Sequence, residues 1–172
     1  AVSPTDANSV EEELGHKLEV GIDFILNGGQ SDIGVESTIV DCFSKSNPKI
    51  LRSGNVTQND IQAKIGYQVI QNLDLENIRF PGGLEKHYSP NAKVIIEGTP
   101  KIGDGFIALS TIATPGGCVR LSSPVDLSEF ARDLYLALRK GDKLNLKRIY
   151  VLIPEGDGIA IAIRERMTKA AR

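Results

Sequence analysis

The chain of 172 residues has no tryptophan, a single methionine, two histidines and two cysteines. Cys42 and Cys118 lie far apart, and neither belongs to a CxxC or a Cys/His pattern. His16 and His87 do not complete a ligand set, so no protein-bound metal site is predicted. We predict that both cysteines are reduced core residues without a catalytic role.

Long apolar runs and a surplus of basic residues are also missing. No stretch approaches the roughly 18 to 20 apolar residues that span a bilayer, and the start lacks a secretory pattern. We therefore predict a cytoplasmic protein without membrane contact. Lysine and arginine number 20 against 22 acidic residues, a formal net charge of -2, so any contact with RNA is expected to be weak and local.

The composition is that of an ordinary folded chain, with 41% hydrophobic and 24% charged residues. In the first part, the cap-forming residues Ser3 to Asp6 predict a helix that ends at Gly15. Alternating apolar residues predict a strand over residues 22–27, which Gly28 and Gly29 end. Further strands are predicted over 37–42 and 49–52, and a helix is predicted from Thr57.

Residues 72–92 have no clean period and contain Pro81 and Pro90, which is typical of a connecting segment. Beyond it, strands are predicted over residues 93–97, 105–109, 118–121 and 147–153. Asp126 predicts the cap of an amphipathic helix, and a last helix is expected over residues 158–171. Strands that alternate with helices indicate a layered α/β unit. We predict three parts, 1–71, a linker 72–92, and 93–172.

Two positions in the first part could carry chemistry. Ser37 and Thr38 lie in the run GVESTIVD (Gly34 to Asp41), where their hydroxyls could contact a ligand or simply begin a strand. Arg52 ends an apolar strand before a glycine turn and a helix, a common place for phosphate binding, although an ion-paired arginine explains it equally well.

Two positions later in the chain have a structural and a functional interpretation. Tyr88, next to His87 in the linker, could cover a nucleotide or anchor the linker to a domain surface. The turn Gly156-Asp157-Gly158 lacks the pattern of a phosphate loop, so we interpret it as the start of a helix.

Five segments in this order resemble the YrdC-like threonylcarbamoyl-AMP synthase family with its carboxyl-terminal extension. They are SPT (3–5), ILNGG (25–29), GVESTIVD (34–41), ILRSGNVT (50–57) and PGGLEKHYSP (81–90). The resemblance implies an incomplete YrdC-like α/β catalytic domain, the linker, and a small Rossmann-like layered domain. The family's basic ATP-binding run and its SAN motif should precede SPT. Because the chain starts at Ala1, we expect a fragment that is inactive alone.

The resemblance also implies the reaction. L-threonine, bicarbonate and ATP, with Mg²⁺, condense to threonylcarbamoyl-AMP and pyrophosphate, for later transfer to tRNA by a modifying complex. Carried over by motif, Ser3, Arg52 and Tyr88 would bind ATP, and Ser37 and Thr38 would bind threonine. No residue of the chain is assigned as a catalytic group.

Some residues depart from the family pattern, and two other functions stay open. Ser53 stands where the family usually has proline, and Gly83 and Glu85 stand where it has larger residues. One alternative is a non-catalytic RNA- or partner-binding module on the same scaffold. The other is the related carbamoyl-transfer domain of hydrogenase maturation factors, which should carry acylphosphatase-like and zinc-finger segments.

Overall fold

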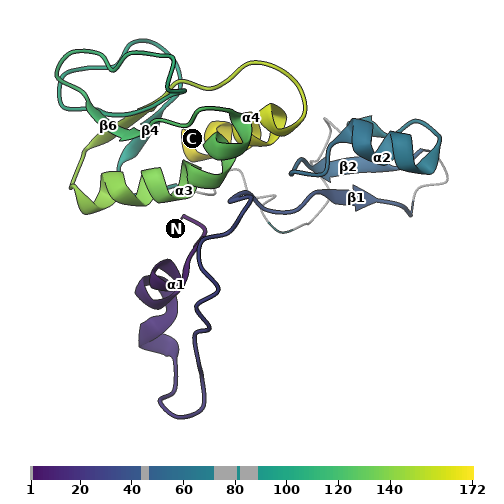
Figure 1. Cartoon of the computed structure of the whole chain (residues 1–172), viewed down its shortest axis with the longest axis horizontal. Coiled ribbons are helices and arrows are strands. Elements are labelled where there is room, and N and C mark those ends of the chain that lie inside the picture. Colours follow the sequence, from purple (N-terminus) through teal and green to yellow (C-terminus); the bar gives the residue numbers. More distant parts are fainter. Residues whose placement is uncertain (1, 44–46, 72–80, 82–88) are drawn as a thin grey trace.

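A computed structural model describes residues 2–43, 47–71, 81 and 89–172. It contains a three-stranded sheet with one helix and a larger four-stranded sheet with two helices, while helix α1 and the loop after it project as an arm (Figure 1). The predictions about residues 72–80 and 82–88, including most of the linker, lie outside the described residues. The division into three parts therefore stays a prediction.

Helix α1 (Ala7–Leu14) confirms the first predicted helix. Asp6 caps it by accepting a hydrogen bond from the Ser9 backbone N–H at 2.7 Å, and a single 3-10 turn at Gly15–Lys17 follows. The strand predicted over residues 22–27 is wrong, because this stretch is neither helix nor strand in the structure. A strand needs a neighbour to receive its backbone hydrogen bonds, and no described segment pairs with it.

The smaller sheet carries the GVESTIVD and ILRSG runs. Strand β1 (Ile39–Asp41) pairs antiparallel with β2 (Lys49–Arg52), and β2 pairs parallel with β3 (Ile70–Gln71). Helix α2 (Gln58–Ile65) begins after Thr57, as predicted. Both predicted strands are confirmed, but β1 is shorter than expected. Ser37 and Thr38 precede it rather than belonging to its ladder.

The larger sheet consists of β4 (Lys93–Ile95), β5 (Gly105–Ile107), β6 (Val119–Ser122) and β7 (Arg148–Val151). The strand order is β4-β7-β5-β6, and every neighbouring pair is parallel. Helices α3 (Leu127–Lys143) and α4 (Ile159–Ala170) pack with alternate strand residues into one apolar core. This arrangement confirms the predicted layered α/β class.

Residues 89–172, with the four-stranded sheet and helices α3 and α4, are here called the larger or carboxyl-terminal body. Its apolar core also includes two residues from the start of the chain. Val2 and Val35 are buried in the same apolar cluster as Phe130 of α3 and Met167 of α4. Gly34, which has φ +72°, comes so close to α3 that a Cβ there would lie 2.4 Å from the Arg132 carbonyl oxygen. The beginning of GVESTIVD is therefore fixed on the carboxyl-terminal body.

The cysteine prediction is partly wrong. Both thiols are free, but Cys42 is exposed and Cys118 is only half-buried, so neither is a core residue. Cys42 directly follows the last residue of β1.

Candidate functional site

Arg52 and Ser37 are in direct contact. Arg52 ends β2 and is 7% exposed; its Nε donates to the Ser37 carbonyl oxygen at 3.0 Å, and its Nη2 donates to Ser37 Oγ at 3.3 Å. Its Nη1 donates to the Pro81 carbonyl oxygen at 2.8 Å. These contacts use three of the five N–H groups of a guanidinium. The structure thus joins two residues that the sequence suggested separately.

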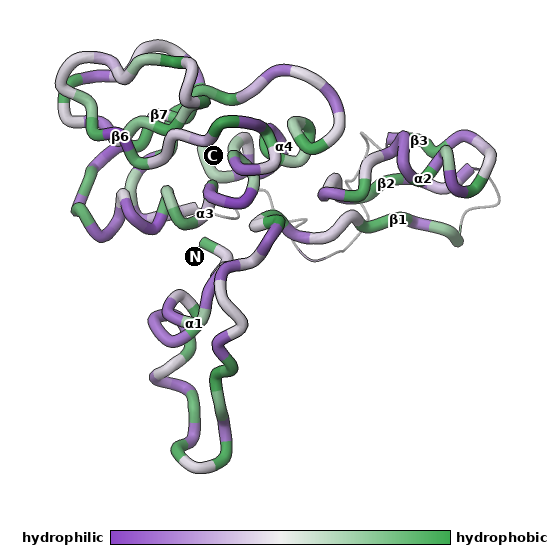
Figure 2. The backbone as a smooth tube through the Cα atoms, viewed as in Figure 1, coloured by the Kyte–Doolittle hydropathy of each residue, from purple (hydrophilic) through white to green (hydrophobic). Residues whose placement is uncertain are grey.

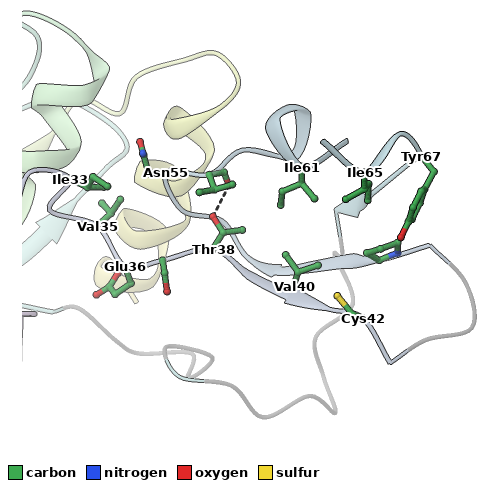
Figure 3. A pocket seen from close by; sticks show the side chains of 13 residues that line it. Ile33, Val35, Glu36, Thr38, Val40, Cys42, Asn55, Ile61, Ile65 and Tyr67 are labelled. Carbon is green, nitrogen blue, oxygen red and sulfur yellow. Dashed lines mark hydrogen bonds between the residues drawn. The ribbon is translucent and has the colours of Figure 1, made fainter. Parts of the chain in front are cut away.

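Thr38, the next residue, contacts the segment between β2 and α2. Its Oγ1 donates to the Val56 carbonyl oxygen at 2.6 Å, a bond drawn as the dashed line in Figure 3. Ser37 and Thr38 both line a cavity of about 570 Å³ between β1 and α2. The other walls are mostly apolar: Ile33, Val35, Val40, Cys42, Pro48, Val56, Ile61, Ile65 and Tyr67, with Glu36 and Asn55 as further polar residues. The cavity suits a small molecule that places polar groups at one end.

Ser3 does not line this cavity. Its hydroxyl donates to Glu36 Oε1 at 2.6 Å, and it borders a separate cavity of about 380 Å³ against Tyr135. Tyr135 also donates to Glu36, at 2.9 Å from Oε2. Ser3 is thus connected to Ser37 through Glu36, the residue before Ser37.

The pKa of the Glu36 carboxyl group is lowered. Partial burial acts to raise its pKa, but the hydrogen bond from Ser3 and the charge and hydrogen bond of Arg166 outweigh it and hold the pKa below the ordinary value. Glu36 is therefore ionised at neutral pH. Figure 3 shows its carboxylate on the opposite side of the backbone from Thr38.

Arg166 of α4 is the residue that the sequence interpretation missed. Its Nε donates to Glu36 Oε2 at 2.8 Å, and its Nη2 donates to the Ser53 carbonyl oxygen at 2.8 Å. The side chain is fully buried. A signal was present, because the apolar positions Ile163, Met167 and Ala170 place Arg166 on the inward face, and a charge there is almost always paired.

Positive charge gathers around the end of α4. The pKa of Lys169 is lowered, first by its burial and then by the neighbouring charges of Arg166 and Arg52, with Glu165 acting in the opposite sense. Lys169 and Arg52 therefore lie close enough to repel each other. An anionic group bound beside Arg52 would reduce this repulsion.

Three further predictions have separate outcomes. Tyr88 lies outside the described residues, and its role stays a prediction. Gly158 stands directly before α4, so the turn at 156–158 does begin a helix. In the parts of the chain that the structure describes, three or more His, Cys, Asp or Glu side chains nowhere gather as a metal-binding group, and no helix is long and apolar enough to cross a membrane.

Two family models match consecutive parts of the chain. The model described as "Threonylcarbamoyl-AMP synthase, C-terminal domain" matches residues 56–172, about two thirds of the chain, and one described as "Telomere recombination" matches residues 1–54. The chain belongs to the threonylcarbamoyl-AMP synthase family. The boundary between the two matched regions falls just after Gly54, between the Ser37–Arg52 contact and α2.

Curated threonylcarbamoyl-AMP synthases match almost all of the chain. The Bacillus subtilis protein is 32% identical and the Pyrococcus abyssi protein 28% identical, each over 98% of this chain. The Schizosaccharomyces pombe protein is 37% identical over 55% of the chain. The chain covers 53% and 54% of the Bacillus and Pyrococcus proteins, and so spans about half the length of these relatives.

Two solved structures of threonylcarbamoyl-AMP synthase relatives share the fold. The crystal structure of P. abyssi Sua5 complexed with L-threonine has a TM-score of 0.79 at 29% identity, over 99% of this chain and 54% of that protein. A variant of the same protein, with an adjacent histidine and tyrosine both replaced by alanine, has a TM-score of 0.77 at 27% identity over 99% of this chain and 53% of the variant. The chain thus shares its fold with these relatives.

Proposed function

We propose that this chain forms part of an L-threonylcarbamoyladenylate synthase, a nucleotidyltransferase. The enzyme would condense L-threonine, bicarbonate and ATP to threonylcarbamoyl-AMP and pyrophosphate. The observation that carries the proposal is the contact between Arg52 and Ser37, because it unites two family motifs beside a cavity in a chain that belongs to this family. An ion-paired surface arginine would not be expected to bind a serine hydroxyl at 7% exposure.

The cavity between β1 and α2 is assigned to L-threonine. Support comes from the relative solved with L-threonine and from the position of Ser37 and Thr38 in the cavity wall. Hydroxyls can accept from the ammonium group or donate to the carboxylate of an amino acid, and the apolar wall suits its methyl group. Threonine is small enough to leave room for a second reactant.

ATP is assigned to the side of the site that Arg52 faces. A guanidinium can bind two phosphate oxygens at once, and Lys169 adds positive charge nearby. Ser3 and Tyr88 are the other residues assigned to ATP. For Tyr88, support comes from the solved variant that removes an adjacent histidine and tyrosine, because His87-Tyr88 is the one such pair in this sequence. Mg²⁺ would arrive with the phosphates rather than on protein ligands.

The chemistry needs positioning more than a protein nucleophile. Bicarbonate and the threonine amine form a carbamate with the loss of water, and a carbamate oxygen attacks the α-phosphorus of ATP. A mixed anhydride forms, the bond to the β-phosphate oxygen breaks, and pyrophosphate leaves. Arg52 would offset the negative charge that builds on the phosphates, and the hydroxyls of Ser37 and Thr38 would hold threonine in line. Tyr88 would help exclude water from the labile products.

The downstream steps belong to the same proposal. The product would pass to a tRNA-modifying transferase complex in the cytoplasm. The net charge of -2 favours at most a weak direct contact with tRNA. The chain of 172 residues would be inactive alone, because it spans about half the length of the relatives that it matches. The binding-module alternative predicts salt-dependent tRNA binding without any turnover.

The test is pyrophosphate release from ATP in the presence of threonine and bicarbonate. It should be measured on the gene's full-length product and on its Arg52→Ala and Tyr88→Phe variants, with Arg132→Ala as the control. Arg132 is an arginine of α3 whose side chain is 40% exposed and pairs with Glu129 and Asp133. We expect threonine-dependent release, a loss of about 100-fold or more in Arg52→Ala, a smaller loss in Tyr88→Phe, and none in the control. If pyrophosphate release by the full-length protein does not depend on threonine, the proposed reaction is ruled out. If both variants are fully active, the proposed site is ruled out.

A further inference from the structure

Arg166 of helix α4 forms hydrogen bonds with Glu36 and Ser53, the neighbours of Ser37 and Arg52 in the sequence. Arg166 binds the Glu36 carboxylate at 2.8 Å and the Ser53 carbonyl oxygen at 2.8 Å. Glu36 is joined by one peptide bond to Ser37, and Ser53 is joined by one peptide bond to Arg52. A single guanidinium thus ties together the two chain segments that meet in the proposed site.

Glu165, the neighbour of Arg166, adds two further hydrogen bonds between α4 and Ser53. Its carboxylate accepts from the Ser53 backbone N–H at 3.1 Å and from the Ser53 hydroxyl at 2.8 Å. All three polar groups of Ser53 therefore bind α4. A proline at this position, the residue expected from the family resemblance, would lack both the N–H and the hydroxyl, so the departure at Ser53 is matched by Glu165.

Glu36, the other partner of Arg166, is also held by several hydrogen bonds. Glu36 also accepts hydrogen bonds from Ser3 at 2.6 Å and Tyr135 at 2.9 Å, so both carboxylate oxygens are held. Arg166 is fully buried, and such a charge stays in place only while its partners are present. The backbone of Gly54 lies against Thr38 and Glu36 with no room for a side chain, so the two segments cannot slide past each other.

From these contacts we infer that Arg166 is a positioning residue, through which the carboxyl-terminal body sets the placement of Ser37 and Arg52. Arg166 is not itself a lining residue of the cavity between β1 and α2, and it acts on Ser37 and Arg52 through their neighbours Glu36 and Ser53. The inference rests on the proposed function for its kinetic consequence, whereas its structural consequence can be measured without any activity. It also gives the carboxyl-terminal body a role, namely to fix the threonine-site segments.

The first experiment measures hydrogen exchange by mass spectrometry on the 172-residue chain and its Arg166→Met variant. Methionine keeps a long unbranched side chain without the charge. We expect exchange in residues 35–42 and 50–56 to rise by about tenfold, which corresponds to the loss of one or two hydrogen bonds. Peptides from β5 and β7 report whether the core stays folded, and Arg164→Met is the matched control, because Arg164 lies on the same helix and donates to the Pro154 carbonyl oxygen at 3.2 Å.

A milder variant keeps the inference testable if Arg166→Met does not fold. Tyr135→Phe removes one hydroxyl that donates to Glu36. It should raise exchange about threefold in residues 35–42 and leave residues 50–56 unchanged. If the core stays protected and neither variant changes exchange in these segments, the inference is overturned.

The second experiment separates positioning from general stability. In the gene's full-length product, Arg166→Met should raise the KM for threonine by about tenfold while kcat changes less than about threefold. Loss of folded enzyme alone would lower kcat at an unchanged KM, and that result would contradict positioning. Arg166→Lys should not rescue the KM, because one ammonium group cannot bind both Glu36 and Ser53 in the fork geometry. A wild-type product without threonine-dependent turnover would reject the proposed function, and the exchange result would still decide the role of Arg166.

Discussion

Gly54 shows how a single missing side chain brings the site residues together. A Cβ at this position would lie 2.4 Å from the Thr38 backbone nitrogen and 2.7 Å from the Glu36 carbonyl oxygen. We predict that Gly54→Ala lowers the free energy of unfolding by about 1 to 3 kcal/mol, because the two segments must move apart. Urea denaturation measures the change.

The control for Gly54 is Gly28→Ala, because nothing lies within 4 Å of a Cβ there and its φ is not in the left-handed region. We expect the free energy of unfolding of this variant to lie within about 0.5 kcal/mol of the wild-type value. Equal stability of the two variants would show that the segments can separate without cost.

The sequence predicts the site residues only in part. Ser37 and Arg52 could be named because they lie in motifs whose order is typical of the family, and their contact follows from two neighbouring strands. Glu36 and Arg166 could not be paired from the sequence, because 130 positions separate them. The contact of α4 with the segments before β1 and after β2 brings the two charges together, and local patterns contain no information about such a contact.

At the scale of elements, α2 depends on its amino-terminal cap. The Thr57 hydroxyl accepts from the Asp60 backbone N–H at 3.2 Å, while the Asp60 carboxylate accepts from the Thr57 backbone N–H at 2.8 Å. We predict that Thr57→Ala destabilises the chain by about 1 kcal/mol. Thermal unfolding against Asn59→Ala, an exposed change on the same helix, measures the effect. A Thr57→Ala variant as stable as this control would mean that α2 does not need its cap.

The contact between α4 and the segment before β1 should depend on pH. The folded pKa of Glu36 lies below its ordinary value of 4.5, because Ser3 and Arg166 outweigh the effect of burial. The stabilisation is therefore fully present above the ordinary value and is lost as pH falls through the folded pKa. Glu165 is the other acid beside Arg166, with its Oε2 at 3.4 Å from Arg166 Nη1. We predict that acid loosens this contact before it unfolds the larger sheet.

The matched comparison for this pH effect is Glu36→Gln, which keeps a similar shape without a titrating group. Hydrogen exchange in residues 35–42 should rise between pH 5 and pH 3 by more in the wild type than in the variant, after correction for the intrinsic rates. Parallel pH profiles would show that Glu36 does not hold the contact.

The elements themselves could be predicted where their signals are local. Asp126 accepts from the Glu129 backbone N–H at 2.8 Å, and α3 begins where its cap and apolar period indicate. The failed strand over residues 22–27 has an equally clear period of two, since Val20, Ile22, Phe24 and Leu26 alternate along it. A helix satisfies its own backbone, whereas a strand forms only against a partner.

At the scale of the whole molecule, burial divides unevenly between the two bodies. Residues 89–172 hold twenty of the buried hydrophobic residues in the described chain, and residues 2–71 hold only Val2, Val35, Ile50 and Val69. Eleven of the seventeen large hydrophobic residues that are exposed lie in residues 2–71, among them those of the arm (Figure 2). The first part therefore depends on the carboxyl-terminal body for its stability.

This uneven burial leads to a prediction for the isolated 172-residue chain. Val20, Ile22, Phe24 and Leu26 are 65% to 99% exposed along the projecting arm, so the chain should bind the dye ANS while it is folded. A double change, Phe24→Ser with Leu26→Ser, should remove a large share of the dye fluorescence and leave the free energy of unfolding within about 0.5 kcal/mol of the wild type, because neither side chain is buried. Ile102→Ser, an 86% exposed residue of the larger body, is the control and should change the fluorescence little. Strong destabilisation by the double change would show that the arm is packed against the rest of the chain in solution.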